Sequence, residues 1–126
     1  MYNPSNTTIL VADDESLTLK MLTYRLQKEG FDVVPAQNGK EAMDAIAHRR
    51  PNLILTDLMM PFFTGLEILA HVKQHVDASI PVVILTSMGQ EPYLRQAFEL
   101  GVDGYCEKPV NPSELVELVH KLLKIG

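Results

Sequence analysis

Three short segments of the chain are continuously apolar, and each ends at polar residues. They cover residues 8–12, 53–56 and 81–85. Runs of about four to eight apolar residues that end at turn signals are typical of strands buried on both faces. Two weaker segments, 31–36 and 102–106, carry more polar residues, and a proline in the first of them suits an edge strand. The sequence therefore predicts five strands, with the three apolar ones at the centre.

Between these strands, apolar residues recur three and four positions apart, which is the spacing of one helix face. Asn38 and Thr64 are each followed three residues later by Glu, the pattern of a capping box at the start of a helix. Asn111, just before Pro112, is expected to cap the last helix. In the fourth helix, Leu94, Ala97 and Phe98 are expected on one buried face. The expected helices cover about residues 16–29, 39–48, 65–76, 92–100 and 112–122.

Strands that alternate with helices predict a parallel sheet with right-handed crossovers and helices on both faces. With the two polar strands at the edges, the strand order becomes 2-1-3-4-5. This is an α/β fold of the three-layer, doubly wound (βα)5 flavodoxin-like type. The order in which successive strands are added to the sheet reverses between the first and third strands. Ligands of such sheets bind at that point, beyond the carboxyl ends of the strands.

Length and composition limit the possible functions. A chain of 126 residues with 46% hydrophobic and 21% charged residues predicts one globular domain, expected over residues 7–126 behind a flexible tail at residues 1–6. The net charge of −5 disfavours direct binding to nucleic acid or to anionic membranes. One cysteine and a polar start favour the cytoplasm, and no apolar run approaches the ~20 residues of a membrane span.

Chemically capable residues follow four of the predicted strands and should share one crevice. They are Asp13, Asp14, Asp57, Thr86 and Lys108. Carboxylates about 5 Å apart repel by about 3 kcal/mol per pair at an effective dielectric near 20, so protons or a cation must offset the charge. Oxygen ligands suit Mg²⁺, and an ammonium with a hydroxyl suits a phosphoryl group. The set predicts a site that holds a phosphoryl group on or near Asp57.

In this order and at these strand ends, the residues resemble those of a response-regulator receiver domain of two-component signal transduction. The resemblance covers about residues 7–123. The positions that carry it are Asp13 and Asp14, Asp57, Met60 and Pro61, Gly65, Thr86, Tyr105, and Lys108 with Pro109. Each position alone is weak, but the ordered set is highly specific.

The resemblance implies a Mg²⁺-dependent phosphorelay chemistry. A phosphohistidine on a sensor histidine kinase or a phosphotransfer protein would give its phosphoryl group to Asp57. Similar proteins hold Mg²⁺ through the counterparts of Asp14, Asp57 and the backbone carbonyl of Met59, with Asp13 acting through water. Lys108 would pair with a phosphoryl oxygen. Such a domain accepts and slowly hydrolyses a phosphoryl group and is not a multiple-turnover enzyme.

The resemblance also implies a conformational switch. Thr86 would move its hydroxyl onto the phosphoryl group, and Tyr105 would turn inward into the space left behind. This would change the surface formed by the fourth helix, the fifth strand and the fifth helix, where a downstream target or output domain would bind. Pro61 and Gly65 would be structural, and the peptide bond before Pro109 is expected to be cis.

Some positions depart from the family pattern. Met59 and Met88 flank the site where similar proteins often have polar side chains that position the hydrolytic water, which predicts a long-lived acyl phosphate. Thr64 stands where an acidic residue is common, and Thr caps helices nearly as well. Phe62 and Phe63 replace small or polar residues, and they either fold back onto the core or form an exposed patch.

Three other functions fit parts of the pattern. A metal-dependent phosphohydrolase with an Asp nucleophile typically has a second Asp two residues later, and that position is Met59. A nucleotide binder needs a glycine- or hydroxyl-rich loop after the first strand, whereas this loop is acidic. A receiver-like binding platform without phosphorylation would not need the acids together with Thr86 and Lys108.

Overall fold

The computed structural model describes residues 6–125. The strands are β1 (Thr8–Ala12), β2 (Asp32–Ala36), β3 (Leu53–Asp57), β4 (Val82–Thr86) and β5 (Gly104–Glu107). The helices are α1 (Ser16–Lys28), α2 (Gly39–His48), α3 (Gly65–His71), α4 (Glu91–Glu99) and α5 (Pro112–Leu122), and a π-helical segment, η2 (Val72–Val76), continues α3. The tail expected at residues 1–6 lies, apart from Asn6, outside the described residues.

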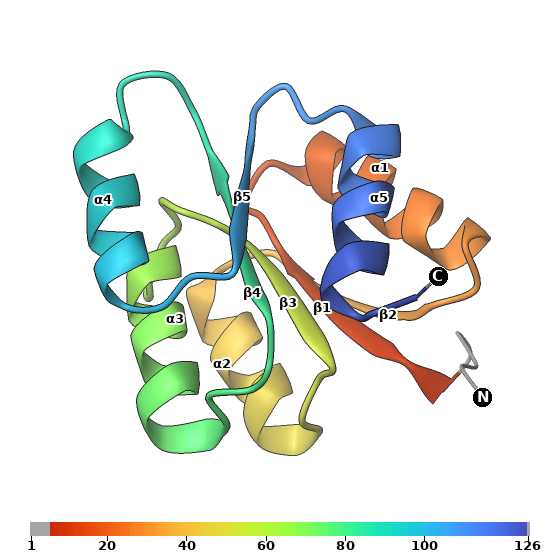
Figure 1. Cartoon of the computed structure of the whole chain (residues 1–126), viewed down its shortest axis with the longest axis horizontal. Coiled ribbons are helices and arrows are strands. Elements are labelled where there is room, and N and C mark those ends of the chain that lie inside the picture. The colour runs from red at the N-terminus through yellow and green to blue at the C-terminus, as the bar shows by residue number, and fades with distance from the viewer. Residues whose placement is uncertain (1–5, 126) are drawn as a thin grey trace.

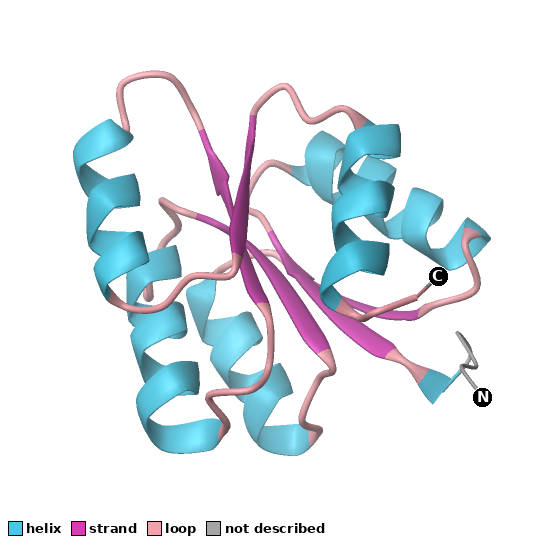
Figure 2. Cartoon of the chain, in the orientation of Figure 1, coloured by secondary structure: helices cyan, strands magenta, loops and turns pink. Residues whose placement is uncertain are grey.

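The five strands form one parallel sheet in the order β2-β1-β3-β4-β5. Helices α1 and α5 cover one face, and α2, α3 and α4 cover the other (Figure 1). Figure 2 shows the same three layers, with the strands between two groups of helices. The predicted α/β class and strand order are therefore confirmed.

The alternation of side chains along each strand builds two separate cores. Ile9 and Val11 of β1 face the side covered by α1 and α5, whereas Leu10 and Ala12 face the side covered by α2, α3 and α4. All five residues of β1, β3 and β4 are buried. Strands buried on both faces must be apolar throughout, which is why these segments have no polar alternation.

Helix starts follow the predicted capping residues. Asn38 Oδ1 accepts from the Glu41 N–H at 2.9 Å, and Thr64 forms a reciprocal capping box with Glu67. Asn111 Oδ1 accepts two backbone N–H groups at the start of α5. Each cap satisfies helix donors that have no partner within the helix.

The third helix ends differently from the sequence prediction. Its last turn is the π-helical segment η2, where Lys73 donates to the carbonyl oxygens of Ala78 and Ile80 and lies 2.8 Å from Asp103 Oδ2. Asp103 also accepts from the Val82 N–H at 2.8 Å. Lys73 thus ties the end of this helix to the starts of β4 and β5, a long-range contact that the apolar spacing could not indicate.

The expectation that Phe98 is buried in α4 is wrong. Ala97 is buried, but Phe98 is 56% exposed and meets the Tyr105 ring edge-on, with the centroids 6.0 Å apart. The reason is that β5 is an edge strand whose residues are only half-buried, so the helix face above it stays open. The strand itself begins at Gly104, two residues later than predicted.

No helix in the described part of the chain has the length and apolar content needed to cross a bilayer.

Candidate functional site

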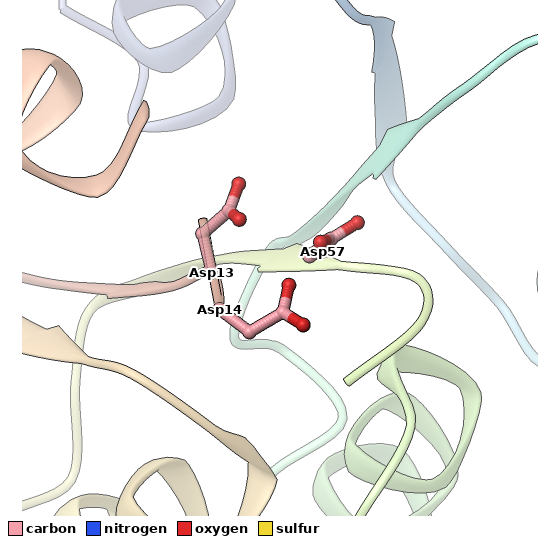
Figure 3. Close-up of side chains that lie close together, drawn as sticks. All are labelled: Asp13, Asp14 and Asp57. Atoms are coloured by element: carbon pink, nitrogen blue, oxygen red, sulfur yellow. The ribbon is translucent and has the colours of Figure 1, made fainter. Parts of the chain in front are cut away.

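Three carboxylates meet at the carboxyl ends of β1 and β3. Ala12 of β1 lies opposite Thr56 of β3 in the sheet. The next residue of each strand, Asp13 and Asp57, therefore lies beside the other at the strand ends. Together with Asp14 they offer oxygen atoms that all lie within 4.8 Å of one another (Figure 3). Asp13 and Asp57 are buried, and Asp14 is exposed. The sheet register therefore produces the predicted cluster.

Lys108 reaches the same cluster from the end of β5. Its Nζ lies 2.9 Å from Asp13 Oδ2 and 3.2 Å from Asp57 Oδ2. The backbone N–H of Lys108 donates to the Thr86 carbonyl at 2.8 Å, and the Lys108–Pro109 peptide bond is cis, as expected. The ammonium is thus fixed between the two buried carboxylates.

The charges in this site are unbalanced. Burial raises the pKa of Asp57 from 3.8 to about 6, and the neighbouring Asp13 adds to the rise, while Lys108 opposes it. Burial alone would lower the pKa of Lys108, but the Asp13 and Asp57 carboxylates outweigh it and raise that pKa. One ammonium does not neutralise three carboxylates, so the ionised site favours a further cation.

The donor set fits Mg²⁺. Its ligands would all be oxygens, and exposed Asp14 leaves one side open to solvent, where a hydrated ion can keep its waters. Asp13 Oδ1 accepts from the Glu15 N–H at 2.9 Å, which fixes the carboxylate. Its Oδ2 is buried and has no well-angled hydrogen bond within the described chain, so the contact with Lys108 is an ion pair. The Met59 carbonyl stays a predicted ligand.

The side chains of Thr86 and Tyr105 make their contacts outside the acidic cluster, although the Thr86 carbonyl accepts from the Lys108 N–H. Thr86 is buried at the end of β4, and its hydroxyl donates to Gln90 Oε1 at 3.2 Å. Tyr105 is 45% exposed beside Phe98. The sequence interpretation missed Gln90, for which the only signal was a polar side chain just before α4.

The loop between β3 and α3 is held by close backbone contacts. A Cβ on Gly65 would lie 2.4 Å from the Asp57 carbonyl oxygen, and a Cβ on Gly39 would lie 2.1 Å from the Phe63 carbonyl oxygen. The Gly39 N–H also donates to the Pro61 carbonyl at 3.0 Å. Gly65 was predicted as structural from the resemblance. Gly39, which the sequence prediction placed only at the start of a helix, is required by this packing.

The two phenylalanines after Pro61 do not fold back onto the core. Phe62 is 71% exposed and has a φ of 73°, a conformation that non-glycine residues rarely adopt. Phe63 is 36% exposed. Neither side chain joins the two core clusters, so the first of the two alternatives is wrong, and the patch stays a prediction.

The arrangement matches one protein family. A family model described as the response regulator receiver domain matches residues 9–120. The chain belongs to this family. Receiver domains are the regulated modules of two-component response regulators, and the acidic pocket of Asp13, Asp14 and Asp57 is consistent with a phosphoacceptor site.

Curated relatives of this receiver domain are transcriptional regulators. It is 36% identical over 118 residues to the phosphate regulon transcriptional regulatory protein PhoB of Pseudomonas aeruginosa, an alignment that covers 93% of the chain and 52% of PhoB. It is 36% identical over 124 residues to the transcriptional regulatory protein ResD of Bacillus subtilis, covering 98% of the chain and 51% of ResD. The chain thus spans about half the length of the curated relatives it matches.

Solved receiver structures share the fold over almost the whole chain. The receiver domain of the Francisella response regulator 1452 is 31% identical with a TM-score of 0.84, and the match covers 94% of this chain and 98% of that one. The chemotaxis response regulator CheY4 of Vibrio cholerae is 26% identical with a TM-score of 0.86, and the match covers 94% and 99% of the two chains.

Proposed function

We propose that this receiver domain, expected over residues 7–126, is a Mg²⁺-dependent phosphoacceptor that takes a phosphoryl group on Asp57. The donor would be a sensor histidine kinase or a histidine phosphotransfer protein. The observation that carries the proposal is the position of the Lys108 ammonium, 2.9 Å from Asp13 and 3.2 Å from Asp57, at the end of the central strand pair.

The transfer would use groups already assembled. A carboxylate oxygen of Asp57 attacks phosphorus, a new P–O bond forms, and the P–N bond to the donor imidazole breaks with its electron pair returning to the ring nitrogen. A pKa of about 6 leaves Asp57 mostly ionised, and so nucleophilic, at neutral pH. Lys108 would move its contact from the carboxylate to a phosphoryl oxygen, where it neutralises charge.

Asp14, Asp57 and the Met59 carbonyl would hold Mg²⁺, with Asp13 acting through water. When bound, the ion supplies positive charge to the phosphoryl oxygens and lowers the repulsion between the acids. Asp13 and Asp57 also share Lys108, so the two carboxylates stay close enough to face one ion.

The phosphoryl group would be removed slowly by hydrolysis and would act as a signal in the cytoplasm. Thr86 and Tyr105 would couple Asp57 to the surface formed by α4, β5 and α5, where a target or an output domain binds. The sheet register supports this coupling. Tyr105 of β5 lies opposite Ile84 of β4, and Ile84 is two residues before Thr86 on the same strand. The proposal includes no direct binding to nucleic acid and no membrane insertion.

Incubation with Mg²⁺ and acetyl phosphate, followed by intact-mass measurement, tests the proposal. The wild-type protein should gain one phosphoryl group, and Asp57→Asn should gain none. Asp44→Asn, which changes an exposed carboxylate on α2, is the matched control and should behave as wild type. Equal labelling of wild type and Asp57→Asn would refute the assignment of Asp57. Continuous turnover of a phosphoester would instead favour a phosphohydrolase.

A further inference from the structure

The hydroxyl of Thr86 already has an acceptor in this structure, and the acceptor is not in the acidic pocket. Its Oγ1 lies 3.2 Å from Gln90 Oε1 and 3.5 Å from the Ser87 carbonyl oxygen. Thr86 is 3% exposed, so water has little access to the hydroxyl. The single proton of this hydroxyl is therefore directed toward Gln90.

The orientation of the Gln90 amide follows from a second contact. Gln90 Oε1 also accepts from the Ser87 N–H at 2.7 Å. If the amide were flipped, its NH₂ group would face that N–H donor, which is unfavourable. The oxygen must therefore face Ser87, and Thr86 can only act as the donor in its contact with Gln90.

We propose that Gln90 is a positioning residue that holds the Thr86 hydroxyl away from Asp57 and thereby opposes phosphoryl binding. The inference rests on the proposed function of Asp57 and Thr86. To donate to a phosphoryl oxygen, Thr86 must first break its bond to Gln90, because a hydroxyl has one proton to donate. Gln90 and the phosphoryl group thus compete for the same donor.

The loop that carries Gln90 is loosely packed at the preceding residue. Gly89 has a φ of +90°, and a Cβ at this position would meet no heavy atom of the described chain within 4 Å. The Ser87 N–H contact can persist when Thr86 leaves, because Gln90 Oε1 accepts the two donors independently. Release of Thr86 therefore costs one hydrogen bond to a neutral acceptor, a net effect of about three- to tenfold on an equilibrium constant.

The test is the affinity for beryllofluoride, which takes the place of a phosphoryl group on a carboxylate, measured by calorimetry in saturating Mg²⁺. Gln90→Met keeps the side-chain length but removes the acceptor, and it should bind beryllofluoride about three- to tenfold more tightly than wild type. Gln90→Ala removes the same acceptor with less bulk and should change the affinity in the same direction. Unchanged affinity in both variants would overturn the proposal.

A double-mutant cycle with Thr86→Val separates the proposed contact from a general effect on the loop. Without the hydroxyl, Gln90 has nothing to hold, so Gln90→Met in the Thr86→Val background should change the affinity less than about twofold. An equal gain in both backgrounds would show that Gln90 acts through the loop and would overturn the proposal. If wild type itself failed to bind beryllofluoride, the proposed function would fall together with this inference, whereas wild-type binding with no gain refutes the inference alone.

Discussion

Asp57 must be ionised to accept a phosphoryl group, but its burial disfavours the negative charge. Its carboxylate is buried beside Asp13, and its pKa is raised to about 6. A raised pKa in the native state means that the stability contributed by this group is fully present below its unfolded value of 3.8 and is lost as the pH rises through about 6.

Asp57→Asn should therefore stabilise the protein at pH 7.5 in the presence of a chelator. The gain should be about 1–2 kcal/mol, since solvent at the open side of the site screens part of the repulsion. The gain should shrink as the pH falls toward 4, where wild-type Asp57 is protonated. Urea unfolding at several pH values measures the difference, and Asp44→Asn should show no comparable pH dependence. A less stable Asp57→Asn protein at pH 7.5 would contradict the charge balance described above.

Met59 and Met88 give a second prediction for single residues. Their side chains are 47% and 96% exposed. A thioether has no donor and is only a weak acceptor, so neither side chain is expected to position a hydrolytic water near Asp57. The double variant Met59→Asn, Met88→Glu should shorten the acyl-phosphate lifetime at least about fivefold, the effect of one added hydrogen bond of about 1 kcal/mol. The decay of the phosphorylated protein, followed by intact mass after removal of acetyl phosphate, gives the lifetime. An unchanged lifetime would count against the prediction.

At the scale of elements, the β3–α3 connection fixes the backbone of the phosphoacceptor. Gly65→Ala would place a methyl group against the Asp57 carbonyl oxygen, which cannot move without shifting the strand end. The substitution should cost about 1–3 kcal/mol of unfolding free energy and weaken Mg²⁺ binding. Gly104→Ala is a matched control, because its Cβ would meet only the flexible Leu118 side chain at 3.3 Å. Urea unfolding and calorimetry should separate the two, and equal effects would refute the role given to Gly65.

The elements also show how far the sequence alone determines the structure. The buried strands and the caps at Asn38, Thr64 and Asn111 were predictable, because short-range patterns specify them. The end of the third helix was not, because Lys73 acts on Asp103, thirty residues away. Phe98 was misplaced because helical spacing identifies an apolar face but does not show whether the neighbouring strand covers it.

The candidate site was predicted more completely than the contacts around it. Asp13, Asp14, Asp57 and Lys108 come together because parallel strands deliver their carboxyl ends to one edge of the sheet. The contact of Thr86 with Gln90 depends on the rotamers of two side chains in a loop, and no periodic pattern specifies these. The assigned roles of the site residues stay predictions for experiment.

At the scale of the whole molecule, phosphoryl binding at one edge of the sheet should be detected on the α4, β5 and α5 surface. Tyr105 is half-exposed beside Phe98, and its inward movement would remove that ring contact. In NMR spectra, beryllofluoride with Mg²⁺ should therefore shift the backbone amide signals along α4 and β5, as well as those around Asp57. The C-terminal half of α2, which packs against β1 and β2 away from the loop that follows Asp57, should change little and serves as the internal reference. Shifts confined to the acidic pocket would argue against coupling.

The central claim is that Asp57 alone accepts the phosphoryl group. Borohydride reduces an acyl phosphate to an alcohol, so it converts a phosphorylated aspartate to homoserine, and peptide mass spectrometry then locates the residue. After treatment with acetyl phosphate and Mg²⁺, we expect homoserine at position 57, and none when Mg²⁺ is chelated. Homoserine at position 13 or 14, or none at all with Mg²⁺ present, would contradict it.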